Sequence, residues 1–169
     1  MTPPDADFYI RQLQLEPHPE GGYYRQVYAG AETPLPDGRR RAQYTSIFFL
    51  LRAGFPSHLH RLRSDELWYW HAGAALTLHL LHPGGRYDAV RLGPDLAGGE
   101  VLQYAVPAGV IFGSSVEVAG AGPAFGVVSC MVSPGFDFAD FELFTQAELL
   151  AQFPQQAEVI AQLAYAELP

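Results

Sequence analysis

The chain has 169 residues, of which 49% are hydrophobic and 17% are charged, and its formal net charge is −8. This length and apolar content predict one domain over residues 1–169 with a full core, and they exclude a disordered protein. The negative charge argues against nucleic-acid binding, which needs a positive face. All ten basic residues are arginine, so Schiff-base catalysis by a lysine is excluded.

The sequence predicts a cytoplasmic protein. It has no apolar run long enough to span a bilayer, and its N-terminus lacks the charged and apolar regions of a secretory signal. The single cysteine, Cys130, cannot form an intrachain disulfide, and it lies in an apolar run over 127–132 that predicts a buried strand. We therefore expect neither a membrane partner nor a nucleic-acid partner.

The first third of the chain predicts a short helix followed by two strands. Apolar residues among polar neighbours favour a helix over 5–15, and the Pro/Gly-rich segment 17–22 then favours a turn. Strand-like residues follow over 23–28, with a Pro/Gly loop at 33–38. The segment 44–51 ends in a nearly continuous apolar run, which is typical of a strand buried on both faces.

The middle of the chain predicts a series of short strands separated by turn residues, at spacings near ten residues. Such spacing favours an all-β sandwich or barrel over a fold in which strands and helices alternate. These segments are 57–62, 66–72, 75–82, 86–92, 100–106, 110–118 and 124–132.

The end of the chain predicts two helices. Thr145 is followed three residues later by Glu148, which is the pattern of a capping box at a helix start. Pro154 is expected to open the second helix, because proline is favoured in the first turn.

Two histidines and a glutamate suggest a metal site. His58 and His60 lie two residues apart in a predicted strand, where alternate side chains share a face, and a short turn could bring Glu66 back beside them. Two imidazoles and one carboxylate suit a divalent ion such as iron, manganese, nickel or zinc. The sequence offers no obvious fourth ligand. His79 or His71 could supply one only if the strand register aims it inward, and His71 is expected on the strand face opposite to Glu66.

The same residues also fit a metal-free site. His60 and Glu66 would act as a catalytic acid/base pair, because imidazole titrates near neutral pH and a carboxylate can orient it. We expect Trp68, Trp70 and Tyr24 to form aromatic walls for a sugar or another small ring. Arg25 or Arg61 would pair with an anionic group of the ligand.

Other polar residues are expected to have simpler roles. His18 lies beside prolines in a turn and is expected at the surface, and Glu20 fits turn chemistry as well as a pocket role. Asp137, Asp140 and Glu142 lack the spacing of a calcium loop, so we expect them to be solvated or paired with arginines.

The motif around His58 resembles the cupin superfamily, whose members are small jelly-roll barrels. The first cupin motif is matched in order by Gly54, His58, His60, Glu66 and Gly73. The second motif runs Pro-x-Gly, two residues, His. Here Pro107, Gly109 and Phe112 occupy it, so that Phe112 stands where the fourth ligand would be.

The chain is most similar to the cupin-5 domain family, almost from end to end. That family keeps the histidine at position 60 without requiring the one at 58, so membership does not imply a metal. The resemblance implies a jelly-roll barrel that is commonly dimeric, and it implies no particular reaction. It is carried by residues 17–23, 45–51, 60–61, 64–68, 107–109, 133–138 and 140–142.

These patterns and the resemblance predict an all-β cupin jelly-roll barrel with a short N-terminal helix and two C-terminal helices, forming a homodimer. We expect a small-molecule pocket centred on His60 and Glu66, with Phe112 near its wall. Isomerase or epimerase chemistry on a sugar or polar metabolite is the first hypothesis. The alternatives are a metal-dependent, oxygenase-type cupin that uses His58, His60 and Glu66, and a ligand-binding or storage-like cupin without chemistry.

Overall fold

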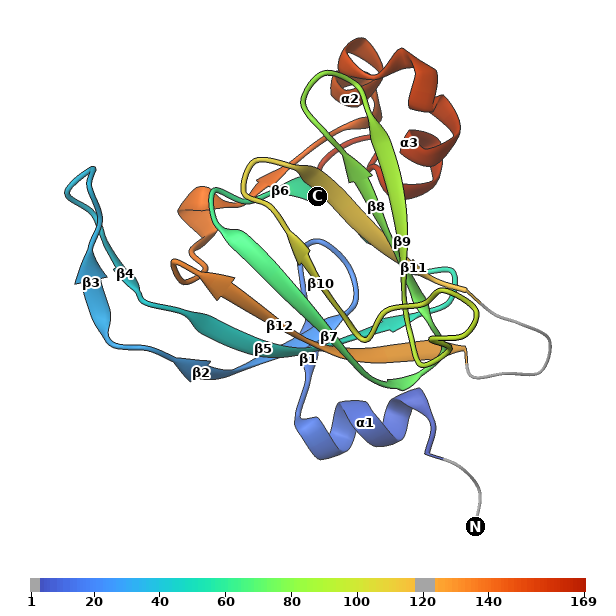
Figure 1. Cartoon of the computed structure of the whole chain (residues 1–169), viewed down its shortest axis with the longest axis horizontal. Coiled ribbons are helices and arrows are strands. Elements are labelled where there is room, and N and C mark those ends of the chain that lie inside the picture. Colours follow the sequence, from blue (N-terminus) through green and yellow to red (C-terminus); the bar gives the residue numbers. More distant parts are fainter. Residues whose placement is uncertain (1–3, 118–123) are drawn as a thin grey trace.

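The computed structural model describes residues 4–117 and 124–169, which form mostly antiparallel β-structure together with three α-helices (Figure 1). Each C-terminal helix follows its expected start, because Thr145 and Glu148 form the capping box and Pro154 opens a helical turn. The helical segments are α1 (Ala6–Leu13), α2 (Gln146–Gln152), α3 (Ala157–Leu163) and the short 3-10 turns η1 (Phe138–Asp140) and η2 (Pro154–Gln156).

Two antiparallel sheets form the body of the molecule. The six-stranded sheet has the order β1 (Glu16–Pro17), β2 (Tyr23–Ala29), β5 (Thr45–Arg52), β12 (Phe125–Ser133), β7 (Asp65–Gly73) and β10 (Gln103–Val106). The five-stranded sheet has the order β13 (Glu142–Leu143), β6 (Ser57–Arg61), β11 (Ile111–Val116), β8 (Leu76–Leu81) and β9 (Tyr87–Leu92).

Three details differ from the sequence prediction. The expected loop at 33–38 is the turn of a hairpin formed by β3 (Glu32–Pro34) and β4 (Arg40–Ala42), which projects beyond the sheets at the left of Figure 1. The expected strand at 100–106 is shortened to β10, and residue 118 of the segment 110–118 lies outside the described residues. The two-residue strands β1 and β13 were not anticipated, because two residues are too short to show a pattern.

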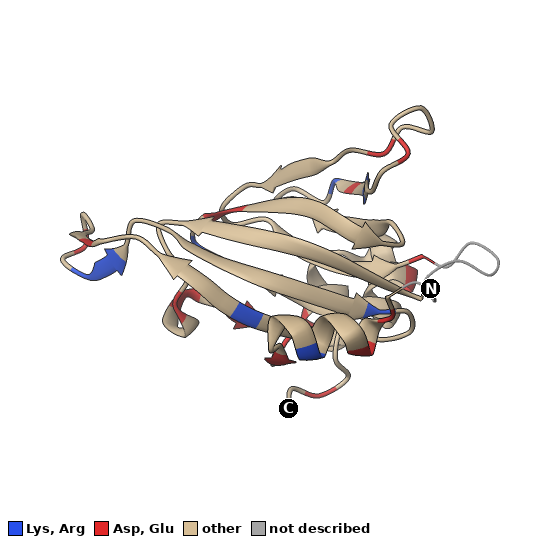
Figure 2. Cartoon of the chain, turned by 90° about the horizontal axis from the view of Figure 1, so that it is seen from below, with Lys and Arg blue, Asp and Glu red and all other residues tan. Residues whose placement is uncertain are grey.

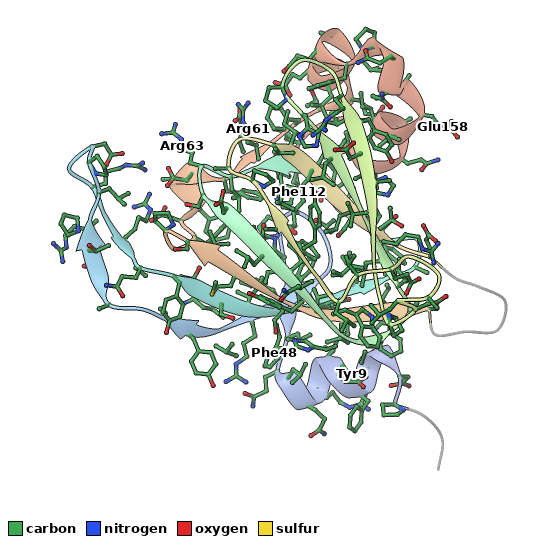
Figure 3. All side chains as sticks on the ribbon, viewed as in Figure 1. Tyr9, Phe48, Arg61, Arg63, Phe112 and Glu158 are labelled. Carbon is green, nitrogen blue, oxygen red and sulfur yellow. The ribbon has the colours of Figure 1, made fainter. Side chains whose placement is uncertain are left out.

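The main core lies between the two sheets. Phe49 and Trp68 of the six-stranded sheet pack in one apolar cluster with Leu78 and Phe112 of the five-stranded sheet. Figure 3 shows Phe112 in the interior, whereas Arg61 and Arg63 lie toward the periphery. The sheets therefore face each other, and side chains that point inward from either one can share a cavity.

Helices cover the outer faces. Helix α1 packs on the six-stranded sheet through Ala6 against Leu50 and Val127, and Figure 3 shows Phe48 near this helix. Helices α2 and α3 pack on the five-stranded sheet, where Leu149 joins the cluster that contains Leu59. Strand β5 is therefore buried on both faces, as expected. None of the helices in the described ranges is long and apolar enough to cross a membrane.

The charged side chains of the strands are mostly exposed or half-buried. Figure 2 shows blue and red segments mainly at turns, at strand ends and on α1, while most of the sheet ribbons are tan. Glu66 is an exception, because it is a strand residue whose side chain is buried. A buried carboxyl group in an apolar sheet costs free energy unless it is neutral or well paired, so such a residue needs a specific explanation.

Candidate functional site

A cavity of about 370 Å³ opens between the two sheets, within the size range of small-molecule sites. Side chains from both sheets line it, together with the turn before β2 and the segment before η1. Its lining includes Glu16, His18, Glu20, Tyr24, Arg25, Phe49, His60, Glu66, Trp68, Cys130, Phe136 and Phe138.

Five residues singled out from the sequence line this cavity. His60 comes from β6 and Glu66 from β7, and both side chains are buried. Tyr24 and Trp68 contribute aromatic surface. Arg25 lines the edge, but its guanidinium donates hydrogen bonds to the carbonyl of Leu13 (3.2 Å) and to Gln14 Oε1 (2.7 Å), both near α1.

Three other expected residues do not line the cavity. Trp70 donates its indole N–H to the carbonyl of Ala74 at 3.2 Å. Phe112 packs behind His60, with ring centroids 4.3 Å apart, and so belongs to the core rather than to the pocket surface. His58 lies on another face, where its ring stacks on Tyr165 at 3.6 Å. The expectation that His58 and His60 aim at one point is therefore wrong.

A β-bulge in β6 explains this separation. His60 pairs with Phe112 and Ser57 pairs with Ser114, so two residues of β6 lie opposite the single residue Gly113 of β11. A bulge of this kind breaks the strict alternation of side chains along the strand. A Cβ atom at Gly113 would lie 2.7 Å from the carbonyl oxygen of Ser57, so the bulge fits against a residue without a side chain.

The expected metal ligands do not come together. In residues 4–117 and 124–169, no group of three or more His, Cys, Asp or Glu side chains is arranged to hold a metal ion. His58 is turned away by the bulge, and Phe112, which the resemblance aligns with the fourth ligand, is buried in the core. The residues present therefore do not fit a site built from His58, His60 and Glu66.

The bulge instead fixes the orientation of His60. Its Nδ1 atom lies 2.7 Å from the carbonyl oxygen of His58, and because a carbonyl can only accept, Nδ1 carries the proton and donates. Nε2 is then the ring atom that can take up a proton, and it lies 3.5 Å from Glu20 Oε2. Hence His60 has the orientation of a general base with a carboxylate beside it.

His18 and Glu20 are the main residues that the sequence analysis misplaced or left open. His18 is not at the surface, since its side chain is only 6% exposed. Its Nδ1 accepts a hydrogen bond from the backbone N–H of Glu20 at 3.2 Å and lies 3.4 Å from Glu20 Oε2. Burial lowers the pKa of His18, and the charge of Glu20 opposes this only in part, so the ring is neutral at pH 7.

Glu20 is held in place by its surroundings. Its Oε1 accepts a hydrogen bond from the Ser57 hydroxyl at 2.8 Å, and its backbone carbonyl accepts from the backbone N–H of His58 at 2.7 Å. The turn residues that follow it, Gly21 and Gly22, both have positive φ angles. The sequence Pro-His-Pro-Glu-Gly-Gly contains a signal for the position of Glu20, because two glycines directly after a carboxylate allow a tight turn against another segment.

We expect Gly21→Ala to destabilise the chain by roughly 3 kcal/mol or more. Gly21 has φ of +109°, and a Cβ atom there would lie 2.2 Å from the carbonyl oxygen of Pro56. Gly54→Ala is a matched control, because Gly54 has φ of +79° with nothing within 4 Å, so only the backbone strain of about 1 kcal/mol applies. Urea unfolding of both variants measures the difference, and equal losses would contradict the close approach at Gly21.

Glu66 is a buried acid of the cavity whose pKa is strongly raised. Burial first, and then the charge of Glu20, raise its pKa to about 8, so its carboxyl group is protonated at neutral pH. The Cys130 thiol and the Trp68 indole lie beside it. The Trp68 Nε1 atom is buried and makes no hydrogen bond of normal geometry with any described residue. The cavity therefore holds a neutral acid with the N–H group of Trp68 beside it.

The acidic residues near η1 pair with arginines, one of the two roles expected for them. Asp140 Oδ1 lies 2.6 Å from Arg39 Nη1, and its Oδ2 lies 3.1 Å from Arg41 Nη2. Glu142 lies 2.6 Å from Arg61. The same segment carries Phe136 and Phe138, which line the cavity. The ion pairs therefore attach this segment to the β3–β4 hairpin and to β6.

The chain is similar to proteins of the same size and fold. A hypothetical protein from Leishmania major shares 48% identity, covering 96% of this chain and 99% of that one, with a TM-score of 0.90. A Shewanella oneidensis protein shares 47% identity over 98% of this chain and 100% of its own, with a TM-score of 0.89. An uncharacterized Saccharomyces cerevisiae protein is 28% identical over 92% of this chain and 84% of its own length.

A more distant likeness concerns the fold alone. Oxalate decarboxylase from Bacillus subtilis matches 94% of this chain with 39% of its own chain, at 17% identity and a TM-score of 0.57. The family model described as Cupin_5, cupin superfamily (DUF985), matches residues 7–144. The chain therefore belongs to the Cupin_5 family of the cupin superfamily.

Proposed function

We propose that this chain is a metal-independent isomerase or epimerase, with a jelly-roll barrel, that moves a proton within a small polar metabolite. The observation that carries the proposal is the orientation of His60. Its Nδ1 is committed to the His58 carbonyl, while its Nε2 lies in the cavity beside Glu20. A histidine held in this way has one nitrogen free for proton transfer and a carboxylate to stabilise the imidazolium that forms.

Glu66 supplies the complementary group. In the proposed reaction, His60 Nε2 takes a proton from a carbon next to a carbonyl group, and the electron pair moves onto the carbonyl oxygen. The neutral Glu66 carboxyl donates a hydrogen bond to that oxygen, which stabilises the developing negative charge. In an isomerisation of an α-hydroxy carbonyl compound, His60 returns the proton to the former carbonyl carbon, while Glu66 gives its proton to the former carbonyl oxygen and takes one from the neighbouring hydroxyl group, so that all atoms balance. In an epimerisation, the enolate turns in the cavity before His60 returns the proton to the other face of the same carbon.

A protonated carboxyl group in one cavity with an oriented imidazole is a common mark of acid/base catalysis. Non-catalytic binding or storage would not require a neutral buried carboxyl group in the same cavity as an oriented imidazole. A metal-dependent reaction has less support. Mn(II) centers are named for Bacillus subtilis oxalate decarboxylase, whose likeness to this chain is one of fold, and the histidines here do not converge.

Deuterium exchange tests the proposal. The purified chain would be incubated in heavy water with a library of aldoses, ketoses, sugar nucleotides and hydroxy acids. The deuterium content of each compound would then be measured by mass spectrometry. We expect one compound to gain a single carbon-bound deuterium at a rate proportional to protein concentration. A thermal-shift screen of the same library should show stabilisation by that compound. If no compound exchanges, although one of them binds tightly, the chain is a binding protein and the proposal is wrong.

A further inference from the structure

The cavity changes character from its interior to its entrance. In the interior, Trp68 and His60 are each 1% exposed. At the entrance, Phe138 is 53% exposed and Glu16 is exposed as well. The acid/base groups thus lie deep, and the entrance is a separate part of the same cavity that can contact the other end of a ligand.

Aromatic rings surround the entrance at steep angles to one another. The rings of Phe136 and Phe138 lie 5.0 Å apart at 83°. His18 stacks on Phe138 at 6.0 Å and meets Tyr24 edge-on at 4.6 Å and 89°. Tyr24, Phe136 and Phe138 therefore lie in one aromatic cluster that lines the cavity, and the face of an aromatic ring attracts an ammonium group by cation–π interaction.

The charge at the entrance has the matching sign. Glu16 pairs with Tyr24 between β1 and β2, and burial together with the Glu16 carboxylate raises the pKa of the Tyr24 phenol. Arg25 also lines the cavity, but its guanidinium donates hydrogen bonds to Leu13 and Gln14. The entrance therefore offers the carboxylate of Glu16 beside aromatic rings, while the guanidinium of Arg25 is held by residues near α1.

We infer that the substrate carries an ammonium group, which binds at the entrance between the rings of Tyr24, Phe136 and Phe138 and beside the carboxylate of Glu16. This inference rests on the proposed function, because it assumes that the reacting end of the same molecule reaches His60. It narrows the substrate class to protonated or quaternary amines with a carbonyl or hydroxyl group a few bonds away. It also disfavours sugar nucleotides, whose phosphates would meet Glu16.

Three probes of nearly equal shape test the charge preference. Choline is cationic, neohexanol is its uncharged carbon isostere, and tert-butylacetate is an anionic relative. Each would be titrated against isotope-labelled protein while the amide resonances of Phe136 and Phe138 are followed by NMR. We expect choline to bind at least tenfold more tightly than neohexanol, and tert-butylacetate to bind more weakly still.

Two entrance variants locate the site. We expect Glu16→Gln to weaken choline binding at least threefold while leaving neohexanol binding unchanged, because only the charge is removed. Phe138→Leu should also weaken choline more than neohexanol, since it removes a ring face but keeps an apolar side chain. Glu32→Gln is the matched control, because Glu32 is an exposed acid of β3 whose side chain pairs with Arg40. Each variant is at an exposed position, so folding should be preserved.

The outcomes separate this inference from the proposed function. Equal or tighter binding of neohexanol or tert-butylacetate, or no response of the entrance amides to any probe, overturns the ammonium site. An effect of Glu32→Gln as large as that of Glu16→Gln overturns it too. The proton-transfer proposal would still stand if an uncharged or anionic metabolite exchanged deuterium, and it fails separately if choline binds as expected but no amine or other compound exchanges.

Discussion

Above pH 8, the Glu66→Gln variant should be more stable than the unchanged chain, by up to roughly 5 kcal/mol in the free energy of unfolding. The pKa of Glu66 is raised from 4.5 to about 8 in the folded chain, because the carboxyl group is buried and faces the charge of Glu20. Each pKa unit corresponds to about 1.36 kcal/mol. Glutamine has nearly the same shape as the protonated acid but never has to ionise.

The sign follows from proton linkage. Between pH 4.5 and about 8, the folded chain keeps the Glu66 proton whereas the unfolded chain releases it. The folded state therefore binds more protons in this window, and its stability falls as the pH rises through it. Below the window the group is protonated in both states, so the penalty vanishes. The advantage of glutamine should thus be small at pH 4, grow through neutral pH and become constant above pH 8.

Urea unfolding at pH 5, 7 and 9 measures this difference. Glu142→Gln is a suitable control, because Glu142 is 53% exposed and paired with Arg61 at the surface. Surface pairs contribute about 1 kcal/mol or less, so the control should change little at any pH. A Glu66→Gln effect that does not vary with pH would show that Glu66 is not a neutral buried acid in the folded chain.

Replacement of His60 by glutamine should lower the deuterium-exchange rate by two to four orders of magnitude. The amide side chain can still form hydrogen bonds near Glu20, but it cannot take up a proton at the position of Nε2. The compound found by the exchange screen would be used at saturating concentration, so that a change in the rate constant is separated from a change in binding.

His58→Gln provides the matched control for this prediction. It changes the other histidine of β6, whose ring stacks on Tyr165 outside the cavity lining. The rate should change by less than tenfold, because the backbone carbonyl that orients His60 remains. Equal losses in both variants would indicate that the two histidines act together, as a shared metal site requires, and would contradict the proposed mechanism.

The sequence predicted the layout of the strands because its turn signals are local. Glycines and prolines between short apolar runs placed β5 to β9, β11 and β12 within a few residues, and the Thr145–Glu148 pattern located the start of α2. It also placed Glu66 and Trp68 on a common inward face of β7, where side chains alternate as expected. These features depend on neighbours in sequence, which is why they can be predicted from one chain.

The position of His58 could not be predicted in this way. Whether β6 contains a bulge depends on how many residues β11 places opposite it, and strand pairing is a long-range property. Likewise, His18 is buried because Tyr24, Phe138 and Phe141 pack around its ring, and two of these residues lie more than a hundred positions away. A histidine between prolines gives no sign of such packing.

The bulge in β6 has a consequence for comparing chains that share the His-x-His pattern. One additional residue in β11, opposite the bulge, would restore regular alternation along His-x-His, and both imidazoles would then project to the same side. Whether the two histidines of this pattern face one metal ion or two different surroundings therefore depends on an insertion or a deletion, not on a substitution. An alignment that matches the two histidines column by column does not show this difference unless the number of residues in the opposing strand is compared as well.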